Sequence, residues 1–381
     1  MRTPLSAVTV IALATALAQS PLAVGADDTA SPRAAPAAPA GPGILEVLTN
    51  SGIVVTGYVD AAYEYSNSPA PAFHEFDTRH SSFVLDQASV TLAMQPKSGF
   101  GFVVDLIAGE DSRVINAAES SNAASGASNF NVTQAFVQYV TGNWTLLGGK
   151  FVTLVGAEVI AATGNTNFSR SLLFFAEPLT HTGVRAAYAV NDELTFTVGV
   201  NNGWNHLSND TQSQKTTEVG VSFTPVKQFI LTAQGYIGDE PVGGGQVAQR
   251  DIADVVATYN VNGSLSLVVN YDCGRQKNYD LLGNNGKWDG VAGYVNYAIN
   301  SQWRVSVRGE YFQDRQGFVT TTGTRQTLRE GTVTLGFDPI KKFELRLEAR
   351  YDKADHDLFL RDSTDLADNQ TGLALQTVYK F

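Results

Sequence analysis

Residues 343–351 read FELRLEARY, so that every odd-numbered position is apolar and every even-numbered position is charged. A side-chain period of two is typical of a β-strand with one apolar and one polar face. The same pattern occurs in residues 303–311 and 194–201, and in 265–272 with Val268 as the exception. Because strands of soluble β-sandwiches alternate in the same way, this period predicts β structure without deciding its architecture.

The spacing of the breaks between strands predicts the architecture. The expected strands are mostly longer than the roughly five or six residues of soluble proteins, and short connections alternate with long ones. Outer-membrane barrels have short turns at one rim and long loops at the other, and about 9–11 residues of each tilted strand span the bilayer. The predicted fold is therefore an all-β transmembrane antiparallel β-barrel with short periplasmic turns and long extracellular loops. We expect 16 strands, at residues 53–66, 82–95, 100–110, 130–140, 144–151, 181–190, 193–203, 215–224, 228–239, 250–260, 264–274, 287–299, 302–314, 328–337, 342–352 and 369–381.

The composition excludes several other classes of protein. Only 17% of the 381 residues are charged, against about 25% in a typical globular protein. After the first 25 residues no apolar run approaches the roughly 18 residues of a membrane-spanning helix. A net charge of −11 argues against nucleic acid as a partner. A single cysteine, Cys273, excludes an intrachain disulfide and a metal site built on cysteines.

Both ends of the chain carry signals for the bacterial envelope. A positive start followed by the apolar run 5–18 and by Val24-Gly25-Ala26 predicts a secretory signal peptide over residues 1–26, with cleavage after Ala18 as an alternative. The Pro- and Ala-rich residues 27–52 are expected to form a periplasmic leader, and residues 53–381 the barrel in the outer membrane. The last strand ends on Phe381, and this ending resembles the signature read by the outer-membrane assembly machinery.

One long motif resembles a known family. It contains GKF (149–151), GAEVI (156–160), NTNFSRS (165–171) and HTGVR (181–185), and continues to VNNGW at 200–204. This run is similar to that of the OmpL-like β-barrel porins, also called β-barrel porin type 2. The family pattern often has Tyr where this sequence has Phe168. The resemblance implies an outer-membrane channel of the porin type.

A barrel of about 16 strands leaves an aqueous lumen, so its inward-facing residues decide what passes. If the apolar positions face lipid, one wall carries arginines and the opposite wall carries Asp60, Glu64, Asp86 and Asp105. Opposed charges of this kind create a transverse field that favours polar solutes. The alternative is that the arginines and the interleaved Glu310, Glu344 and Glu348 form a self-neutralising network that stiffens the barrel. The arginines of the predicted wall are Arg304, Arg308, Arg346 and Arg350.

The long segment 152–180 is the predicted constriction. Loops of this length are usually functional or disordered, and this one carries several large apolar residues that should not face water. We expect it to fold into the lumen and to hold Glu158, Arg170 and Glu177 near the narrowest point, together with the four arginines of the wall. The alternatives are a loop folded over the mouth of the barrel or packed against a neighbouring subunit.

The predicted function is that of an outer-membrane porin, a passive diffusion channel for small hydrophilic solutes or ions. No catalytic residue, cofactor or metal site is expected, and the expected partners are outer-membrane lipid, the solutes and the assembly machinery. A homotrimer is compatible with the sequence but not indicated by it. The main alternative is a plugged structural or adhesive barrel that acts through its loops.

Two further alternatives have less support in the sequence. A lipid hydrolase would use His181 with Ser169 or Ser171, for which no orienting third group is evident. The acid-rich loop 353–368 is expected to be solvated, with divalent-ion binding as the alternative.

Overall fold

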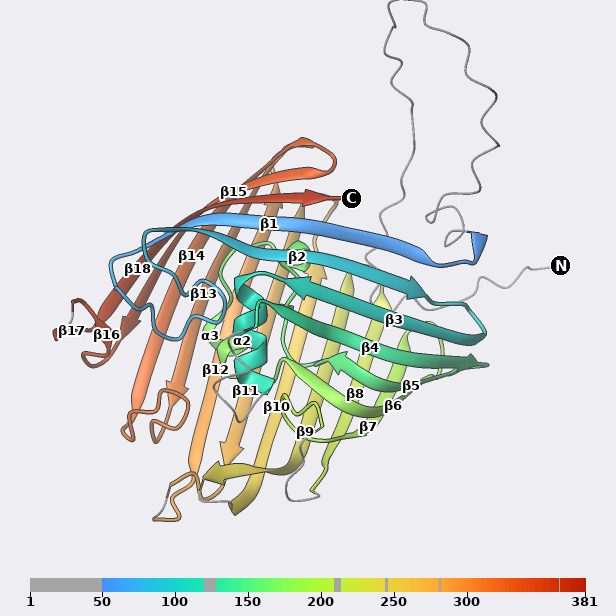
Figure 1. The fold of residues 1–381 in the computed structure, drawn as a ribbon, viewed down its shortest axis with the longest axis horizontal. Helices are drawn as coiled ribbons and strands as arrows, with labels where there is room; N and C mark the ends of the chain where they lie inside the picture. Colours follow the sequence, from blue (N-terminus) through green and yellow to red (C-terminus); the bar gives the residue numbers. More distant parts are fainter. Residues whose placement is uncertain (1–49, 120–127, 209–213, 244–245, 281, 363) are drawn as a thin grey trace, which may run out of the picture.

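The chain forms one closed antiparallel barrel in which consecutive strands are neighbours and the first strand pairs with the last (Figure 1). This computed structural model describes residues 50–119, 128–208, 214–243, 246–280, 282–362 and 364–381. The predicted signal peptide 1–26 and most of the predicted leader 27–52 lie outside the described residues. The prediction of a barrel of 16 strands is confirmed.

The barrel strands have the following bounds: β1 Val54–Ser66, β2 Ser82–Met94, β3 Gly99–Ala108, β4 Phe130–Thr141, β5 Trp144–Val152, β6 Thr180–Ala189, β7 Leu194–Asn201, β8 Thr216–Val226, β9 Phe229–Gly243, β10 Gln246–Asn260, β11 Leu265–Gln276, β12 Gly286–Ala298, β13 Trp303–Asp314, β14 Gln326–Ile340, β15 Phe343–Ala354 and β18 Asn369–Lys380. Between them lie the helices α2 Glu110–Glu119 and α3 Leu172–Phe175, the 3₁₀ turn η2 Ala162–Gly164, and a small hairpin of β16 Phe359–Leu360 and β17 Leu366–Ala367. Among the described residues, no helix is both long and apolar enough to cross a membrane.

Several of the short turns are closed by an asparagine side chain. The Oδ1 atom of Asn191 accepts hydrogen bonds from the backbone N–H groups two and three residues ahead, at 2.9 and 2.8 Å. Asn262 and Asn300 form the same arrangement at the turns after β10 and β12. Such side chains mimic a backbone turn, which lets two or three residues reverse a long strand.

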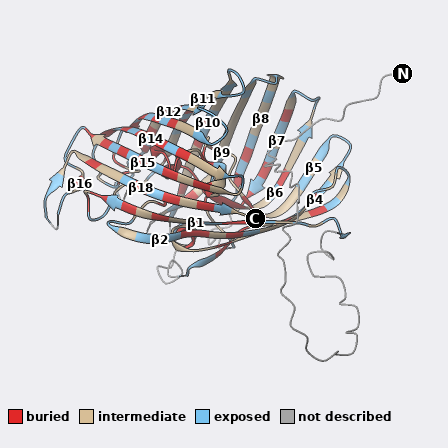
Figure 2. Ribbon diagram, turned by 90° about the horizontal axis from the view of Figure 1, so that it is seen from above, coloured by how far each residue is buried: buried red, intermediate tan, exposed pale blue. Residues whose placement is uncertain are grey.

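The alternation of the sequence separates the two faces of the wall. On β15 the outward Leu347 is 56% exposed, whereas the inward Arg346 is 2% exposed. Buried and exposed residues alternate along the strands (Figure 2). The exposed outer positions are largely apolar, as expected for a surface that faces lipid. Aromatic pairs lie across neighbouring strands near the short turns, such as Trp144 with Tyr188 and Trp303 with Phe337. Aromatic girdles of this kind mark the membrane interface in outer-membrane barrels.

The prediction of a long loop at residues 240–249 is wrong. Strand β9 continues to Gly243 and β10 begins at Gln246, with Glu240 paired to Ala248. Glycine-rich residues 243–245 indicated a loop, but the residues on either side pair and extend the hairpin. Strand β14 likewise runs to Ile340, into the turn predicted at 338–341.

Candidate functional site

Segment 152–180 links β5 to β6 and extends across the interior of the barrel, where it carries η2 and α3 (Figure 1). Its backbone N–H groups donate to side chains of β9, β11 and β2, which lie on different parts of the wall. These bonds join Leu154 to Tyr236 Oη (3.2 Å), Ala157 to Asn270 Oδ1 (2.7 Å) and Ala162 to Gln87 Oε1 (3.1 Å).

Arg308 of β13 connects the segment to the wall through buried ion pairs. Its guanidinium lies 2.8 Å from Glu158 of the segment and 3.2 Å from each of two wall carboxylates, Glu310 and Glu330. It also donates to the carbonyl oxygen and the hydroxyl of Ser169, at 2.9 and 3.0 Å. Arg308 is only 1% exposed. A buried ion pair of this kind is stable only when all its members are present, because removal of one leaves an unpaired buried charge.

Arg170 organises the segment itself. Its guanidinium donates to the backbone carbonyl oxygens of Val159 (2.9 Å), Ile160 (2.8 Å) and Phe168 (2.6 Å). The predicted site residue is therefore buried within the segment and holds its two halves together. Its own carbonyl oxygen accepts a hydrogen bond of 2.6 Å from Arg350 of β15.

The remaining predicted arginines hold the segment against β13 and β15. Arg346 pairs with Glu344 at 2.8 Å and donates to the carbonyl oxygen of Ala162 at 3.2 Å. Arg304 also pairs with Glu344 and donates to the carbonyl oxygen of Thr166 at 2.6 Å. The side chain of Arg304 is 20% exposed, whereas those of the other three arginines are buried. Arg304 therefore retains contact with open space inside the barrel.

Three glutamates accept hydrogen bonds from the backbone of the segment. Glu348 of β15 accepts from Phe168 (2.6 Å) and Ser169 (2.9 Å), Glu310 of β13 accepts from Leu172 (2.9 Å), and Glu158 accepts from Ser171 (2.6 Å). Among the interleaved glutamates of the wall, Glu348 binds the segment, Glu344 pairs with arginines, and Glu310 does both. Sequence reasoning missed Gln87, Asn270 and Glu330, although their polar side chains at inward positions of long strands were a usable signal.

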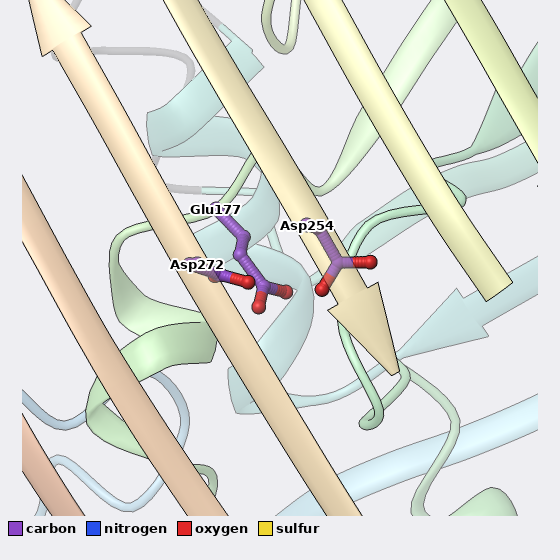
Figure 3. A group of neighbouring side chains, drawn as sticks. All are labelled: Glu177, Asp254 and Asp272. Atoms are coloured by element: carbon purple, nitrogen blue, oxygen red, sulfur yellow. The ribbon is translucent and has the colours of Figure 1, made fainter. Parts of the chain in front are cut away.

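Glu177 lies apart from these arginines. Together with Asp254 of β10 and Asp272 of β11 it forms a group of three buried carboxylates (Figure 3). Burial, followed by the charges of Asp272, Asp254 and Glu158, raises the pKa of Glu177 well above its ordinary value. The predicted site residues are therefore found at two places, one around Arg308 and one around Glu177.

Part of the lumen is filled by apolar side chains. Leu172 and Leu173 of the segment pack in one cluster with inward-facing residues of the wall. We expected the inward set of these strands to be polar and to face water, and for this part of the wall the expectation is wrong. The physical reason is that these positions face segment 152–180 or another loop, such as the one that carries Phe318, so that apolar contact is favourable. The wall residues of this cluster include Tyr236, Ile252, Trp288, Tyr294, Phe312 and Leu328.

The inner wall of β7 to β11 has a different character near the periplasmic turns. There the inward positions are half-buried and carry uncharged hydroxyl groups, which stay in contact with open space. These residues are Thr197, Ser222, Thr232, Thr258 and Ser266. A hollow lined in part by Ser266, Thr166 and Arg304 lies at the same end.

The predicted acidic wall is largely buried. Asp60, Glu64 and Asp86 have almost no exposed surface and lie near α2, which brings Asp111 to the same region. Burial raises the pKa of Asp111 well above its ordinary value. Asp105 alone of the four predicted residues is half-buried, and it accepts hydrogen bonds from Ser89 and Thr91. The predicted arrangement, in which an arginine wall and an acidic wall both face open water, is therefore not found.

The residues proposed for a hydrolase have other partners. His181 hydrogen-bonds through Nδ1 to the carbonyl oxygen of Gly203 (3.1 Å) and stacks on Tyr236. Ser169 binds Arg308, and the Ser171 hydroxyl accepts from the N–H of Phe174 at the start of α3. These interactions do not pair the histidine with either serine.

Comparisons with known proteins agree with this architecture. A family model described as "Putative beta-barrel porin-2, OmpL-like" matches residues 52–381. No curated relative matches the sequence. Among solved structures, the trimer form of OmpT from Vibrio cholerae is similar with a TM-score of 0.59 and 11% identity, covering 86% of this chain and 99% of that one.

Two further channels have the same fold. The outer-membrane channel DcaP of Acinetobacter baumannii has a TM-score of 0.58 and 12% identity, over 86% of this chain and 97% of that one. The anion-selective porin of Comamonas acidovorans has a TM-score of 0.57 and 13% identity, over 86% and 99%.

Proposed function

Because the chain belongs to the OmpL-like β-barrel porin-2 family and is therefore an outer-membrane β-barrel, we propose that it is a passive diffusion channel for small hydrophilic solutes or ions. The observation that carries this proposal is the half-buried, hydroxyl-bearing inner wall of β7 to β11, beside a segment that is also bound to β2 and β13. Uncharged hydroxyls can exchange hydrogen bonds with passing water and solutes, and they impose no strong charge selection.

Segment 152–180 is the proposed constriction. The charged residues of the segment and of the adjoining wall have two roles. Glu158, Arg170, Arg308, Arg346 and Arg350 are buried in contacts that hold the segment in place. Arg304 is the member of the set with open space beside it, at the hollow that Thr166 also lines. We therefore assign contact with solute to Arg304 and positioning to the others.

Single-channel conductance in a planar bilayer tests the channel. The wild-type protein should give stable conductance steps, and deletion of residues 156–170 should raise the conductance because the lumen is then wider. Deletion of the exposed tip 282–285 of the loop after β11 is the matched control and should leave the conductance unchanged. In gel electrophoresis, a folded barrel migrates faster before boiling in detergent than after it. This shift would establish that each variant has folded. Equal conductance of the wild type and the 156–170 deletion would rule out the constriction.

A plugged barrel that acts through its loops is the second candidate. The apolar cluster between Leu173 and wall residues such as Trp288 favours it, because such contacts exclude water from that part of the lumen. A wild-type protein that inserts but does not conduct, together with a conducting 156–170 deletion, would favour the plug over the channel.

The proposed partners follow from the family and the fold. We infer that residues 1–26 direct export, that the last strand is read by the outer-membrane assembly machinery, and that the barrel forms a homotrimer in lipid. The V. cholerae OmpT structure of similar fold is described as a trimer form. Chemical cross-linking in native outer membranes should give a band at three times the monomer mass, and a monomer alone would contradict the trimer.

A further inference from the structure

Three carboxylates from distant parts of the chain meet on the inner face of the wall. Asp254 of β10 and Asp272 of β11 are direct partners in the strand register, and Glu177 approaches them from the end of segment 152–180 (Figure 3). One carboxylate oxygen from each residue lies within 4.8 Å of the others. None of the three residues belongs to the cluster around Arg308.

These carboxylates are buried and incompletely bonded. Glu177, Asp254 and Asp272 are 6%, 1% and 0% exposed. Each keeps one buried oxygen that has no hydrogen-bond partner: Glu177 Oε2, Asp254 Oδ2 and Asp272 Oδ2. The amide of Asn270 donates to the other oxygen of each aspartate, at 2.7 and 2.9 Å, and so holds both carboxylates in place. Buried polar atoms are nearly always satisfied in native proteins, so three unpartnered oxygens in one place indicate a missing partner.

The charge of the group also lacks compensation. None of the ion pairs formed among the described residues includes Glu177, Asp254 or Asp272. Several carboxylates in a buried site repel one another unless they share protons or bind a cation. A set made only of oxygen donors suits a hard cation.

The backbone at Gly156 fits closely against this group. Gly156 has a φ of +91°, and a Cβ atom there would lie 2.1 Å from Glu177 Oε2. The segment therefore needs glycine at this position in order to bring its backbone against the carboxylate. This approach fixes the Glu177 oxygens beside the two aspartates.

We propose that Glu177, Asp254 and Asp272 bind one Ca²⁺ ion, which fastens the end of segment 152–180 to β10 and β11. Ca²⁺ binds about six to eight oxygens, carboxylates among them, in a flexible geometry, whereas Mg²⁺ usually keeps several waters and only one or two carboxylates. The three carboxylate oxygens lie within 4.8 Å of one another, close enough to share one ion, and a set of three carboxylates suits Ca²⁺. The site does not depend on whether the lumen conducts.

Calcium titration of the full chain, refolded in detergent micelles and freed of metal with EGTA, tests the site. Calorimetry with CaCl₂ should give saturation at one Ca²⁺ per chain, and the thermal midpoint should rise with added Ca²⁺. Asp254→Asn and Asp272→Asn should each weaken binding at least about tenfold, because each removes one charged ligand. Asp105→Asn changes a half-buried carboxylate of β3 on another part of the wall and should bind Ca²⁺ as the wild type does.

The variants also separate loss of the site from loss of the fold. In EGTA, Asp272→Asn should be at least as stable as the wild type, because it relieves repulsion between carboxylates. The proposal is overturned if the wild type shows no saturable Ca²⁺ binding, or if both Asn variants bind as tightly as the wild type. If the thermal midpoint does not change with added Ca²⁺ but rises as the pH falls, the three carboxylates share protons and do not bind an ion, which overturns the proposal. Equal affinity for MgCl₂ would also contradict the assignment of Ca²⁺.

Discussion

Arg308 joins the wall to segment 152–180 through a single buried guanidinium. Its guanidinium is shared by Glu158, Glu310 and Glu330 and has almost no exposed surface. A planar group with five N–H donors can satisfy more acceptors at once than an ammonium, which has three. Replacement of Arg308 would therefore leave several buried carboxylates without a cation.

The substitution Arg308→Met should destabilise the barrel by about 3–5 kcal/mol, the usual cost of breaking a buried ion pair from one side. Arg315→Met is the matched control, because Arg315 forms an exposed pair with Asp289 whose loss should cost about 0–1 kcal/mol. Urea unfolding of the two variants in detergent micelles measures the difference. Equal midpoints for the two variants would show that the buried cluster contributes no more than a surface pair.

Gly156 provides a second prediction for a single residue. Alanine at this position would combine a positive φ with a contact of 2.1 Å to Glu177 Oε2. We expect Gly156→Ala to lower the free energy of unfolding by about 1–3 kcal/mol. Gly263→Ala, where an added Cβ meets nothing within 4 Å, should change it by less than about 0.5 kcal/mol. A neutral Gly156→Ala would show that the segment can move away from Glu177.

The direction of individual side chains could be predicted from the sequence, but their surroundings could not. The alternation of residues 343–351 places Arg346 and Arg350 on the inward face, and the structure agrees. Whether an inward arginine meets water or another part of the chain depends on segment 152–180, whose path has no period. The grouping of Glu177 with Asp254 and Asp272 was invisible for the same reason.

Among the elements, the extracellular loop 67–81 is attached to the barrel through His74. Its Nε2 atom lies 2.9 Å from Asp352 of β15, and its Nδ1 atom lies 2.6 Å from Asp77 of the same loop. Burial and Arg350 oppose protonation, but Asp77 and Asp352 outweigh them and raise the pKa of His74 to about 9. A histidine in this setting is protonated at neutral pH and binds both carboxylates as a cation.

Attachment of this loop should therefore weaken as the pH rises. A folded-state pKa raised from 6.5 to about 9 gives stability that is complete below pH 6.5 and is lost as the pH rises through about 9. The contribution is at most about 3 kcal/mol. Urea midpoints at pH 6 and pH 9.5 should differ less for His74→Gln than for the wild type, whereas the exposed His356→Gln should behave as the wild type. A His74→Gln variant with an unchanged pH response would contradict this role.

The other loops show which local features a sequence conceals. Helix α2 begins at Glu110, the last residue of the predicted strand 100–110, and continues into the predicted loop 111–129. The small hairpin of β16 and β17 lies within the predicted loop 353–368. Both are too short to produce a clear period in the sequence. The extension of β9 and β10 past residue 240 was hidden by glycines, because a glycine-rich stretch is compatible with both a hairpin and a loop.

The whole molecule is held closed by the pairing of β1 with β18. Strand count and connectivity could be predicted because they depend on alternation and on turn residues, which are local. The filling of the lumen could not, because it depends on contacts between residues far apart in the chain. At one end of the seam between β1 and β18, Phe381 and Gly57 exchange backbone hydrogen bonds of 3.2 and 2.9 Å. The Phe381 ring covers Gly57, where an added Cβ would lie 2.4 Å from it.

The last residue should therefore matter for closure and for assembly in different ways. Phe381→Ala removes the ring over Gly57 but keeps both backbone hydrogen bonds, so we expect a loss of about 1–3 kcal/mol in urea unfolding. Phe83→Ala removes a more exposed lipid-facing aromatic away from this seam and should cost less. In cells, the amount of barrel in the outer membrane should fall for Phe381→Ala more than for Phe83→Ala. If the two variants reach the outer membrane equally, the assembly machinery does not read the terminal aromatic, and Phe381 serves the seam alone.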